Sequence, residues 1–418
     1  MPRVLGSVVE TVVPARLGRS FRWLLASSWV SNLGDGMAIA AGPLLVASQT
    51  QDPFLVALAA LLQWLPPLLF GLYAGALADR LDRRLIVVCV DLLRVLVLVG
   101  LCLTIATDAV SVGVVLGCLF LLGTAEVFAD NTSATLLPML VHRDDLGLGN
   151  ARLMTGFITV NQLAGPPLGA ILFAAGMLWP FLAQALLVLL GALLVFRVVL
   201  PPHGRDRADR TRMRHDIAEG FRWVWHHAAV RTLVLTIFTF NITFGAAWSV
   251  LVLYATQRLG LGELGFGLLA TVSAVGGLVG TAGYGWITQR FSLGAIMRIG
   301  LIIEMFTHLA LALTTSPVLA MVIFFVFGAH AFIWGTTSVT VRQRAVPSPL
   351  QGRVGSVNQV AVFGGLVIGA GIGGLIAQRG GVTAPFWFAF VGSAVFVVLI
   401  WRQLAHISHA EPTPLRKD

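Results

Sequence analysis

The sequence has few charged residues and almost no lysine. Charged side chains make up 11% of its 418 residues, against about 25% in soluble domains. Hydrophobic side chains make up 57% and the mean hydropathy is +0.87, so an ordinary soluble enzyme is excluded and a lipid bilayer is the expected solvent. The net charge is +9, yet Lys417 is the single lysine and the arginines lie mostly between apolar stretches. We attribute this charge to orientation in the membrane and expect no nucleic-acid partner.

The sequence also lacks the residues that mark disulfide frameworks, metal sites and catalytic centres. Its three cysteines, Cys89, Cys102 and Cys118, lie within apolar stretches, whereas a disulfide framework uses an even number of cysteines in loops. We find no metal-spaced His/Cys set, no catalytic Ser/His/Asp set and no G-x-x-x-x-G-K-[ST] loop for ATP. We therefore expect a protein that is not an enzyme and binds no metal or cofactor. The first apolar stretch has no A-x-A cleavage pattern at its end, so we expect it to be retained.

Twelve apolar stretches are long enough to cross a bilayer, which takes about 20 residues of helix. In the first half of the chain they are 22–47, 54–78, 85–106, 110–131, 151–175 and 179–198. In the second half they are 232–256, 264–288, 295–314, 317–340, 354–377 and 384–402. They are too long and too uniformly apolar for the strands of a β-barrel. The predicted fold class is an all-α membrane protein with twelve transmembrane helices.

The basic residues lie almost entirely on one side of these spans. Of 28 lysines and arginines, only Arg258 and Arg379 fall in loops on the other side, and Arg94 lies inside a span. Basic residues are retained on the cytoplasmic side, so we expect both termini, 1–21 and 403–418, in the cytoplasm and the protein in the inner or plasma membrane.

A polar, arginine-rich segment, 199–231, separates the two sets of six spans, 22–198 and 232–402. Its second part has acidic residues followed by apolar residues at helical spacing, which predicts an amphipathic helix in the headgroup layer. We interpret the segment as a cytoplasmic linker. A docking site for a partner is the alternative.

Polar residues and glycines recur in the same order in both halves of the chain. The matching residues are Asn32 and Asn241, Gly36 and Gly245, Gly75 and Gly285, Arg80 and Arg290, Asn161 and Asn358, and Gln162 and Gln359. This order predicts two six-helix repeats in parallel orientation, with a central site between them.

The loop after the second span carries a specific motif. It reads Gly75-Ala-Leu-Ala-Asp79-Arg80-Leu-Asp82-Arg83-Arg84 and resembles the loop-two signature of the major facilitator superfamily. Two further segments, Gly34-Asp35-Gly36 and Gly165-Pro166-Pro167-Leu-Gly169, are similar to the drug/proton antiporter branch that includes macrolide-efflux and enterobactin-exporter proteins. The resemblance implies the major facilitator fold, alternating access, and export of a small molecule.

Three carboxylates inside the spans are candidates for the mechanism, because ionisable residues in hydrocarbon are costly and so are paired, water-facing or functional. Asp35 lies near the middle of the first span, and we predict that it couples proton entry to transport; a carboxylate satisfied by neighbours such as Asn32 is the alternative. Glu126 and Asp130 share a helix face at i, i+4. We predict that Glu126 binds protons or cationic substrate. The resemblance implies that Asp130 and the arginines of Arg80–Arg84 form a latch that closes the cytoplasmic side. Simple charge satisfaction is the alternative for both.

Six further residues are predicted to gate the cytoplasmic side. Asp79 ends the second span, where it makes a contact that exists in one state and breaks in the other. Arg80, Arg83 and Arg84 pair acids or lipid headgroups there, with topology anchoring as the alternative. Asp91 and Arg94, spaced i, i+3, are predicted to form a local ion pair that steadies this region.

In the second half the candidates are fewer. Glu304 and His308 share a face of the ninth span, and we expect a mutually satisfied pair there rather than a proton path. His330 lies in the tenth span, which by the resemblance lines the cavity, so it is a candidate ligand for substrate or proton, with hydrogen-bonded packing as the alternative.

The remaining candidates are amides and a proline pair. The amides are expected to form hydrogen bonds in the cavity or between helices: Asn32, Gln63, Asn161, Gln162, Asn241, Asn358 and Gln359. Gly165-Pro166-Pro167 is expected to bend the fifth span, because proline removes a backbone donor.

Together these features predict a secondary active transporter, a proton-coupled exporter of amphipathic or cationic small molecules. The expected partners are the substrate, protons and membrane lipids, and we expect a monomer. An exporter of a siderophore or lipid-like anion, using Arg94 and His330, is one alternative. A transport-inactive membrane receptor or scaffold is the alternative from another class.

Overall fold

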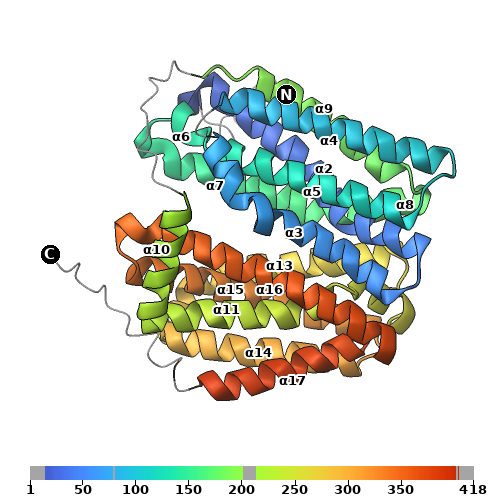
Figure 1. Ribbon diagram of the computed structural model, residues 1–418, viewed down its shortest axis with the longest axis vertical. Coiled ribbons are helices and arrows are strands. Elements are labelled where there is room, and N and C mark those ends of the chain that lie inside the picture. The colour runs from blue at the N-terminus through green and yellow to red at the C-terminus, as the bar shows by residue number, and fades with distance from the viewer. Residues whose placement is uncertain (1–14, 79–80, 201–212, 402, 404–418) are drawn as a thin grey trace, which may run out of the picture. The chain divides into compact units, whose positions relative to one another are not determined.

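The computed structural model describes residues 15–78, 81–200, 213–401 and 403, and every regular element in these ranges is helical (Figure 1). Eleven of the described helices or helical runs are long and apolar enough to cross a membrane. A further apolar helix, α17 (Ala384–Ile400), has 17 residues. The all-α prediction with twelve spans is confirmed.

The first half of the chain contains five continuous long helices and one interrupted one. They are α2 (Gly18–Gln49), α3 (Pro53–Ala78), α4 (Arg83–Ala106), α5 (Val112–Ala134), the run α7 (Leu146–Gly156), η3 (Phe157–Ala164) and α8 (Gly165–Ala175), and α9 (Trp179–Phe196). Short turns η1 (Ala15–Leu17), α6 (Leu137–Leu140) and η2 (Arg143–Asp145) lie between or before them.

The second half repeats this order. It contains α11 (Ala228–Trp248), α12 (Leu251–Leu253), η4 (Tyr254–Arg258), α13 (Glu263–Arg290), α14 (Leu293–Leu313), α15 (Pro317–Ala345), η5 (Ser348–Leu350), α16 (Gln351–Gly380) and α17. The third and fourth helices begin in a similar way in both halves. Asp82 and Ser111 accept hydrogen bonds from the first turns of α4 and α5, and Ser292 and Ser316 do so for α14 and α15. These side chains satisfy backbone donors that a helix leaves free at its first turn.

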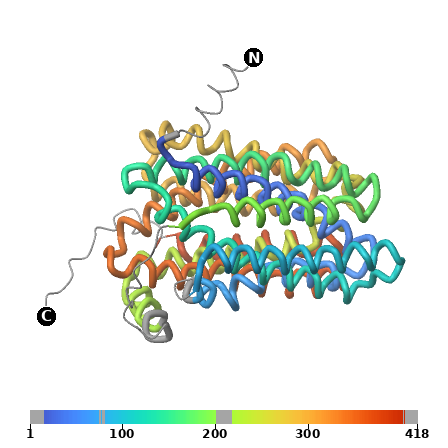
Figure 2. Tube along the Cα trace, turned by 90° about the horizontal axis from the view of Figure 1, so that it is seen from above, coloured from blue at the N-terminus to red at the C-terminus, as the bar shows by residue number. Residues whose placement is uncertain are grey.

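The chain divides into two compact units. The first unit comprises the described residues of Met1–Gln49, Leu69–Asp206 and Phe266–Thr271, and the second those of Thr50–Leu68, Arg207–Gly265 and Val272–Asp418. Within each unit the long helices run lengthwise beside one another (Figure 2).

The helix pairs of the first unit recur in the second. In the first unit α2 packs on α8, η3 and α9, while α4 packs on α5 and α9. In the second unit α11 packs on α16 and α17, while α14 packs on α15 and α17. The first helix of each half therefore packs on the fifth and sixth, and the third on the fourth and sixth, as a duplicated six-helix unit requires.

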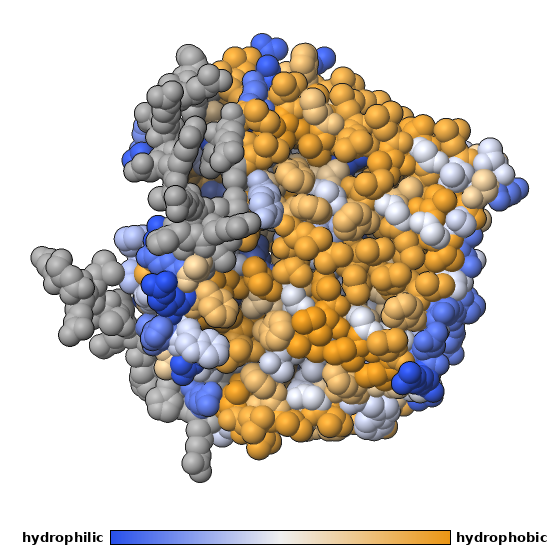
Figure 3. Space-filling model, in the orientation of Figure 1, coloured by the Kyte–Doolittle hydropathy of each residue, from blue (hydrophilic) through white to orange (hydrophobic). Residues whose placement is uncertain are grey.

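The surface supports a membrane location. The face in Figure 3 is covered mainly by hydrophobic side chains, with hydrophilic ones near the helix ends. Exposed apolar side chains include Val398 at 76%, Val318 at 72% and Leu96 at 68%. Such a broad exposed apolar surface is expected where lipid covers the protein.

One helix of the second unit runs across the others. Helix α10 (Met213–His226) lies across the ends of α11 and α16 (Figure 1). Its Glu219 forms an ion pair with Arg353 Nη1 at 2.5 Å, and its Phe221 and Trp225 are exposed, with their rings stacked at 6.2 Å. An amphipathic helix in this orientation suits the headgroup layer.

Candidate functional site

Asp35 lies on α2 beside a glycine that brings another helix against its backbone. A Cβ at Gly36 would collide with the backbone carbonyl of Asn161 in η3, and one at Gly165 would lie 2.5 Å from the Gly36 backbone. Helices approach this closely only where side chains are absent. The Gly-Asp-Gly and Gly-Pro-Pro segments, far apart in the sequence, therefore pack on each other and hold Asp35 in place.

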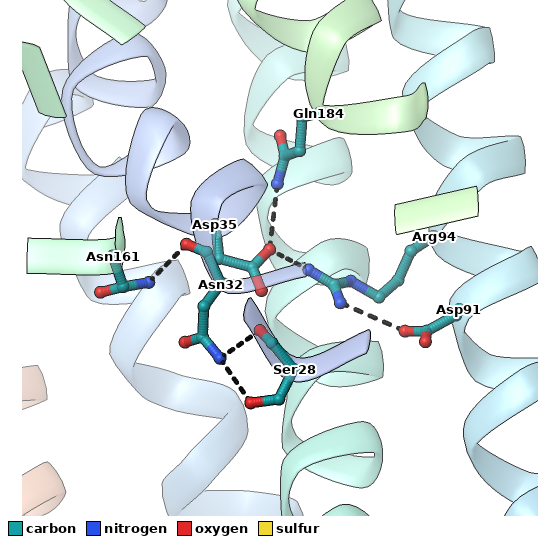
Figure 4. Close-up of polar contacts among 7 residues, drawn as sticks. All are labelled: Ser28, Asn32, Asp35, Asp91, Arg94, Asn161 and Gln184. Carbon is teal, nitrogen blue, oxygen red and sulfur yellow. Dashed lines mark hydrogen bonds and ion pairs between the residues drawn. The ribbon is translucent and has the colours of Figure 1, made fainter. Parts of the chain in front are cut away.

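Asp35 forms an ion pair with Arg94 of α4 (Figure 4). Arg94 Nη1 also donates to Asp91 Oδ1 at 3.2 Å, one turn earlier on α4, so the ion pair that the i, i+3 spacing predicts is present. Gln184 Nε2 of α9 donates to Asp35 Oδ1 at 3.4 Å. The side chains of Arg94, Asp91 and Asp35 are 3%, 4% and 13% exposed. The network thus joins α2, α4 and α9 with little access to solvent, and its role in gating stays a prediction.

Two more carboxylates act on the same guanidinium. Glu126 and Asp130 lie one turn apart on α5, which packs against α4. Both are within electrostatic range of Arg94 and of Asp35. Glu126 is half-buried and Asp130 is exposed. Counting Asp91, these five groups comprise four carboxylates and one guanidinium, which leaves an excess of three negative charges if all are ionised.

Asn32, the amide expected beside Asp35, forms its hydrogen bonds elsewhere. Asn32 Nδ2 donates to the Ser28 carbonyl at 2.7 Å and to Ser28 Oγ at 3.2 Å. The Asn32 carbonyl accepts from Asn161 Nδ2 at 3.1 Å, and Gln162 Nε2 donates to Asn161 Oδ1 at 2.7 Å. These bonds join α2 to η3 (Figure 4). Asn32 therefore does not bind Asp35. Arg94 and Gln184 do, so Asp35 is satisfied by neighbouring side chains, as the alternative expects, and its role in proton coupling stays a prediction.

Sequence reasoning did not find Gln184 or the contact between Asp35 and Arg94. The signal for Gln184 is present, because it is a polar residue in the otherwise apolar helix α9 and is only 4% exposed. The ion pair joins residues 59 positions apart on different helices, and spacing along one helix cannot reveal such a contact.

The Gly165-Pro166-Pro167 segment lies next to an irregular stretch of its span, and the predicted bend stays a prediction. It follows η3, which is a π-helix of eight residues, and starts the regular helix α8. Proline lacks a backbone donor, and local π-helical winding is one way in which a helix adjusts to this. The irregular segment carries Asn161 and faces α2, so it belongs to the same structure that holds Asp35.

The predicted gating residues are only partly described. Asp79 and Arg80 lie outside the described residues. Arg83 Nη1 donates to the Thr135 carbonyl at 3.5 Å and Arg84 Nη1 to the Val198 carbonyl at 3.2 Å. The latch between Asp130 and these arginines stays a prediction.

The amides of the second unit do not form a comparable network in the part of the chain that the structure describes. Asn241 Nδ2 donates within its own helix, to the Ile237 carbonyl at 2.7 Å. Gln63 and Gln359 are exposed, and Asn358 Oδ1 is buried without a partner among the described residues. Their assignment to a cavity stays a prediction.

The predicted pair between Glu304 and His308 is wrong. Both ring nitrogens of His308 are buried and have no hydrogen-bond partner within the described ranges, and the same holds for His330. The i, i+4 spacing places Glu304 and His308 on one face of α14, but no hydrogen bond joins their side chains.

The whole architecture matches known transporters. Residues 11–414 match the model of a family described as transmembrane secretion effectors. The chain belongs to this family, within the major facilitator superfamily.

Relatives of this secretion-effector family member are named as efflux pumps. The chain is 30% identical over 390 residues to the multidrug efflux pump Tap of Mycolicibacterium fortuitum, covering 87% of the chain and 90% of that protein. It is 25% identical over 398 residues to multidrug resistance protein 1 of Bacillus subtilis, covering 92% and 96%. Among solved structures, a variant of the nucleoside transporter NupG has a TM-score of 0.73 at 12% identity and covers 93% of this chain and 99% of its own. This last similarity establishes the fold alone.

Proposed function

We propose that this family member is a proton-coupled exporter of amphipathic or cationic drugs, an antiporter that works by alternating access. The observation that carries the proposal is the buried ion pair between Asp35 and Arg94, whose guanidinium also binds Asp91 and has Glu126 and Asp130 in electrostatic range. The relatives named as multidrug efflux pumps support the substrate class. The asymmetry of the arginines supports cytoplasmic termini.

The charge excess supports proton binding. Placing one uncompensated charge in the hydrocarbon region costs about 2.5–3.5 kcal/mol or more. A cluster with three more carboxylates than guanidinium groups therefore carries bound protons or a cationic partner. These are the two species that an exporter of cationic drugs exchanges.

In this proposal the network has two arrangements. When Asp35 is ionised it holds Arg94. When Asp35 accepts a proton, the ion pair is lost and the guanidinium is freed for the other carboxylates in its range, Asp91, Glu126 and Asp130. The ionisation of Asp35 thus changes the charge available to a cation at Glu126 and Asp130. A transporter needs such coupling between proton and substrate sites.

The same geometry disfavours the export of an anion. The alternative function, export of a siderophore or lipid-like anion, uses Arg94 as a ligand for the anion. Arg94 already binds Asp35 and Asp91. Because four carboxylates lie in range of this one guanidinium, the excess negative charge of the cluster repels an anionic substrate.

The test is drug transport in proteoliposomes with an imposed pH gradient. Asp35→Asn and Glu126→Gln keep the size of each side chain and remove the charge, and we expect both to abolish gradient-driven transport. Asp108→Asn and Glu263→Gln are matched controls, because both residues are exposed and lie outside the network. Asp108 has φ 54°, which asparagine tolerates. Transport that ignores the gradient, or that survives in both test variants, would overturn the proposed coupling.

A further inference from the structure

In each half of the chain, the third helix carries an arginine that reaches the end of the sixth helix. Helix α4 packs on α9, and α14 packs on α17 (Figure 1). Arg84 Nη1 of α4 donates to the Val198 carbonyl just after α9 at 3.2 Å, and its guanidinium lies 5.5 Å from the centre of the Phe196 ring. Arg298 Nη2 of α14 donates to the Trp401 carbonyl just after α17 at 3.1 Å, and its guanidinium lies 5.1 Å from the centre of the Trp401 ring. The same contact between third and sixth helix thus occurs in both units.

Both aromatic rings are exposed and stand at the end of an apolar row on the sixth helix. The exposed fraction is 61% for Phe196 and 40% for Trp401. Exposed apolar side chains continue the rows: Leu193, Leu190 and Leu186 on α9, and Val398, Val395 and Val391 on α17. Residues three and four apart share a helix face, and the two rows have the same spacing. Exposed apolar rows in a membrane span are covered by lipid chains, and each arginine lies where its row ends.

Neither guanidinium is neutralised by a carboxylate in the ranges that the structure describes. No ion pair joins Arg84 or Arg298 to an acidic side chain there. Asp82, the acidic residue nearest to Arg84 in the chain, accepts from the backbone nitrogen of Leu85, and Glu304 lies on another face of α14 than Arg298. A guanidinium has five N–H donors, and each of these two uses one for a helix-end carbonyl. A positive charge with unused donors is thus left at the end of each row.

An arginine that only caps a helix end needs neither an aromatic ring nor an apolar row. Arg258 has such a capping role, since its Nε and Nη2 donate to the carbonyls of Thr314 and Leu313 at the end of α14. Among the described residues, no aromatic ring lies against its guanidinium. The ring, the row and the unneutralised charge therefore distinguish Arg84 and Arg298 from a simple cap.

We propose that each unit binds an anionic phospholipid here, one at Arg84 and Phe196 and one at Arg298 and Trp401. The lipid phosphate accepts hydrogen bonds from the guanidinium, whose planar fork matches phosphate oxygens. The aromatic ring lies at the level of the headgroup, as such rings do at membrane interfaces, and an acyl chain covers the apolar row. An anionic headgroup is favoured over a zwitterionic one, because the site offers positive charge and no carboxylate for an ammonium group. The proposal does not depend on the proposed drug transport.

The test is native mass spectrometry of the purified full-length protein in detergent, with dioleoylphosphatidylglycerol or dioleoylphosphatidylcholine added at equal concentration. We expect the wild type to retain at least about two more molecules of phosphatidylglycerol than of phosphatidylcholine per chain. Arg84→Gln and Arg298→Gln should each weaken one step of phosphatidylglycerol binding about five-fold or more, and the double variant should weaken two. Arg258→Gln is the matched control and should bind as the wild type does. Equal retention of both lipids by the wild type, or unchanged phosphatidylglycerol binding in the double variant, would overturn the proposal.

Variants that keep the charge separate lipid binding from helix capping. Arg84→Lys and Arg298→Lys should retain the preference for phosphatidylglycerol, whereas a loss as large as in the glutamine variants would show that the charge does not bind the lipid. Inorganic phosphate at the same concentration should not displace the lipid, because it has no acyl chain for the apolar row. Displacement would assign the arginines to a free anion instead. The experiment involves no transport, so failure here is distinct from failure of the proposed exporter.

Discussion

Arg94 is the residue whose removal should disturb the first unit most. Arg94→Met keeps an apolar stem of similar length and deletes the guanidinium that binds Asp35 and Asp91. Both carboxylates are at least four-fifths buried, so they are left without a counter-charge. Removing one partner of a buried ion pair costs about 3–5 kcal/mol. A domain of about 150–250 residues loses about 2–4 °C in melting temperature per kcal/mol, so we expect a decrease of about 6–20 °C.

The assay is thermal unfolding of the purified protein in detergent, followed by a double-mutant cycle. Adding Asp35→Asn to Arg94→Met removes one stranded charge and should restore at least about 1 kcal/mol. Arg379→Met is the control, because Arg379 is exposed and such changes stay within about 0.5 kcal/mol. If Arg94→Met has the same melting temperature as this control, or if adding Asp35→Asn does not raise the stability of Arg94→Met, the guanidinium does not stabilise these carboxylates.

Three further substitutions test the packing around the network and the linker helix. Gly169→Ala should destabilise the protein by about 1–3 kcal/mol, because the new Cβ would collide with the Met37 carbonyl. The control Gly117→Ala has nothing within 4 Å of its Cβ and should be neutral or stabilising by up to about 1 kcal/mol. Equal melting temperatures of these two variants would contradict the close contact at Gly169. Gln184→Leu removes one donor to a carboxylate and should cost about 0.5–1.5 kcal/mol, clearly less than Arg94→Met, in the same thermal assay. Glu219→Gln should cost no more than about 1 kcal/mol, because its ion pair is 30–38% exposed and screened by solvent; a larger loss on urea unfolding would mean that α10 is essential to the second unit.

The local features of the site follow from the sequence. The i, i+3 spacing of Asp91 and Arg94 predicts their ion pair, since residues three apart on a helix are neighbours. The proline pair predicts a bend in its span, because proline removes a backbone donor; the structure has the π-helix η3 directly before it, and the bend itself stays a prediction. The same reasoning fails for Glu304 and His308, since a shared helix face permits a contact without requiring it.

The sequence by itself determined the number of spans, their helical nature and the duplication of six helices. A bilayer demands long apolar segments with internally satisfied backbones, and these leave a plain signal along the chain. Only the tertiary structure decided that Asp35 binds Arg94 and Gln184, that Gly36 packs on Gly165, and that His308 lies against the ring of Trp248. These contacts join residues on different helices, and their register depends on how side chains and glycine surfaces interlock in three dimensions, which no spacing along a single helix encodes.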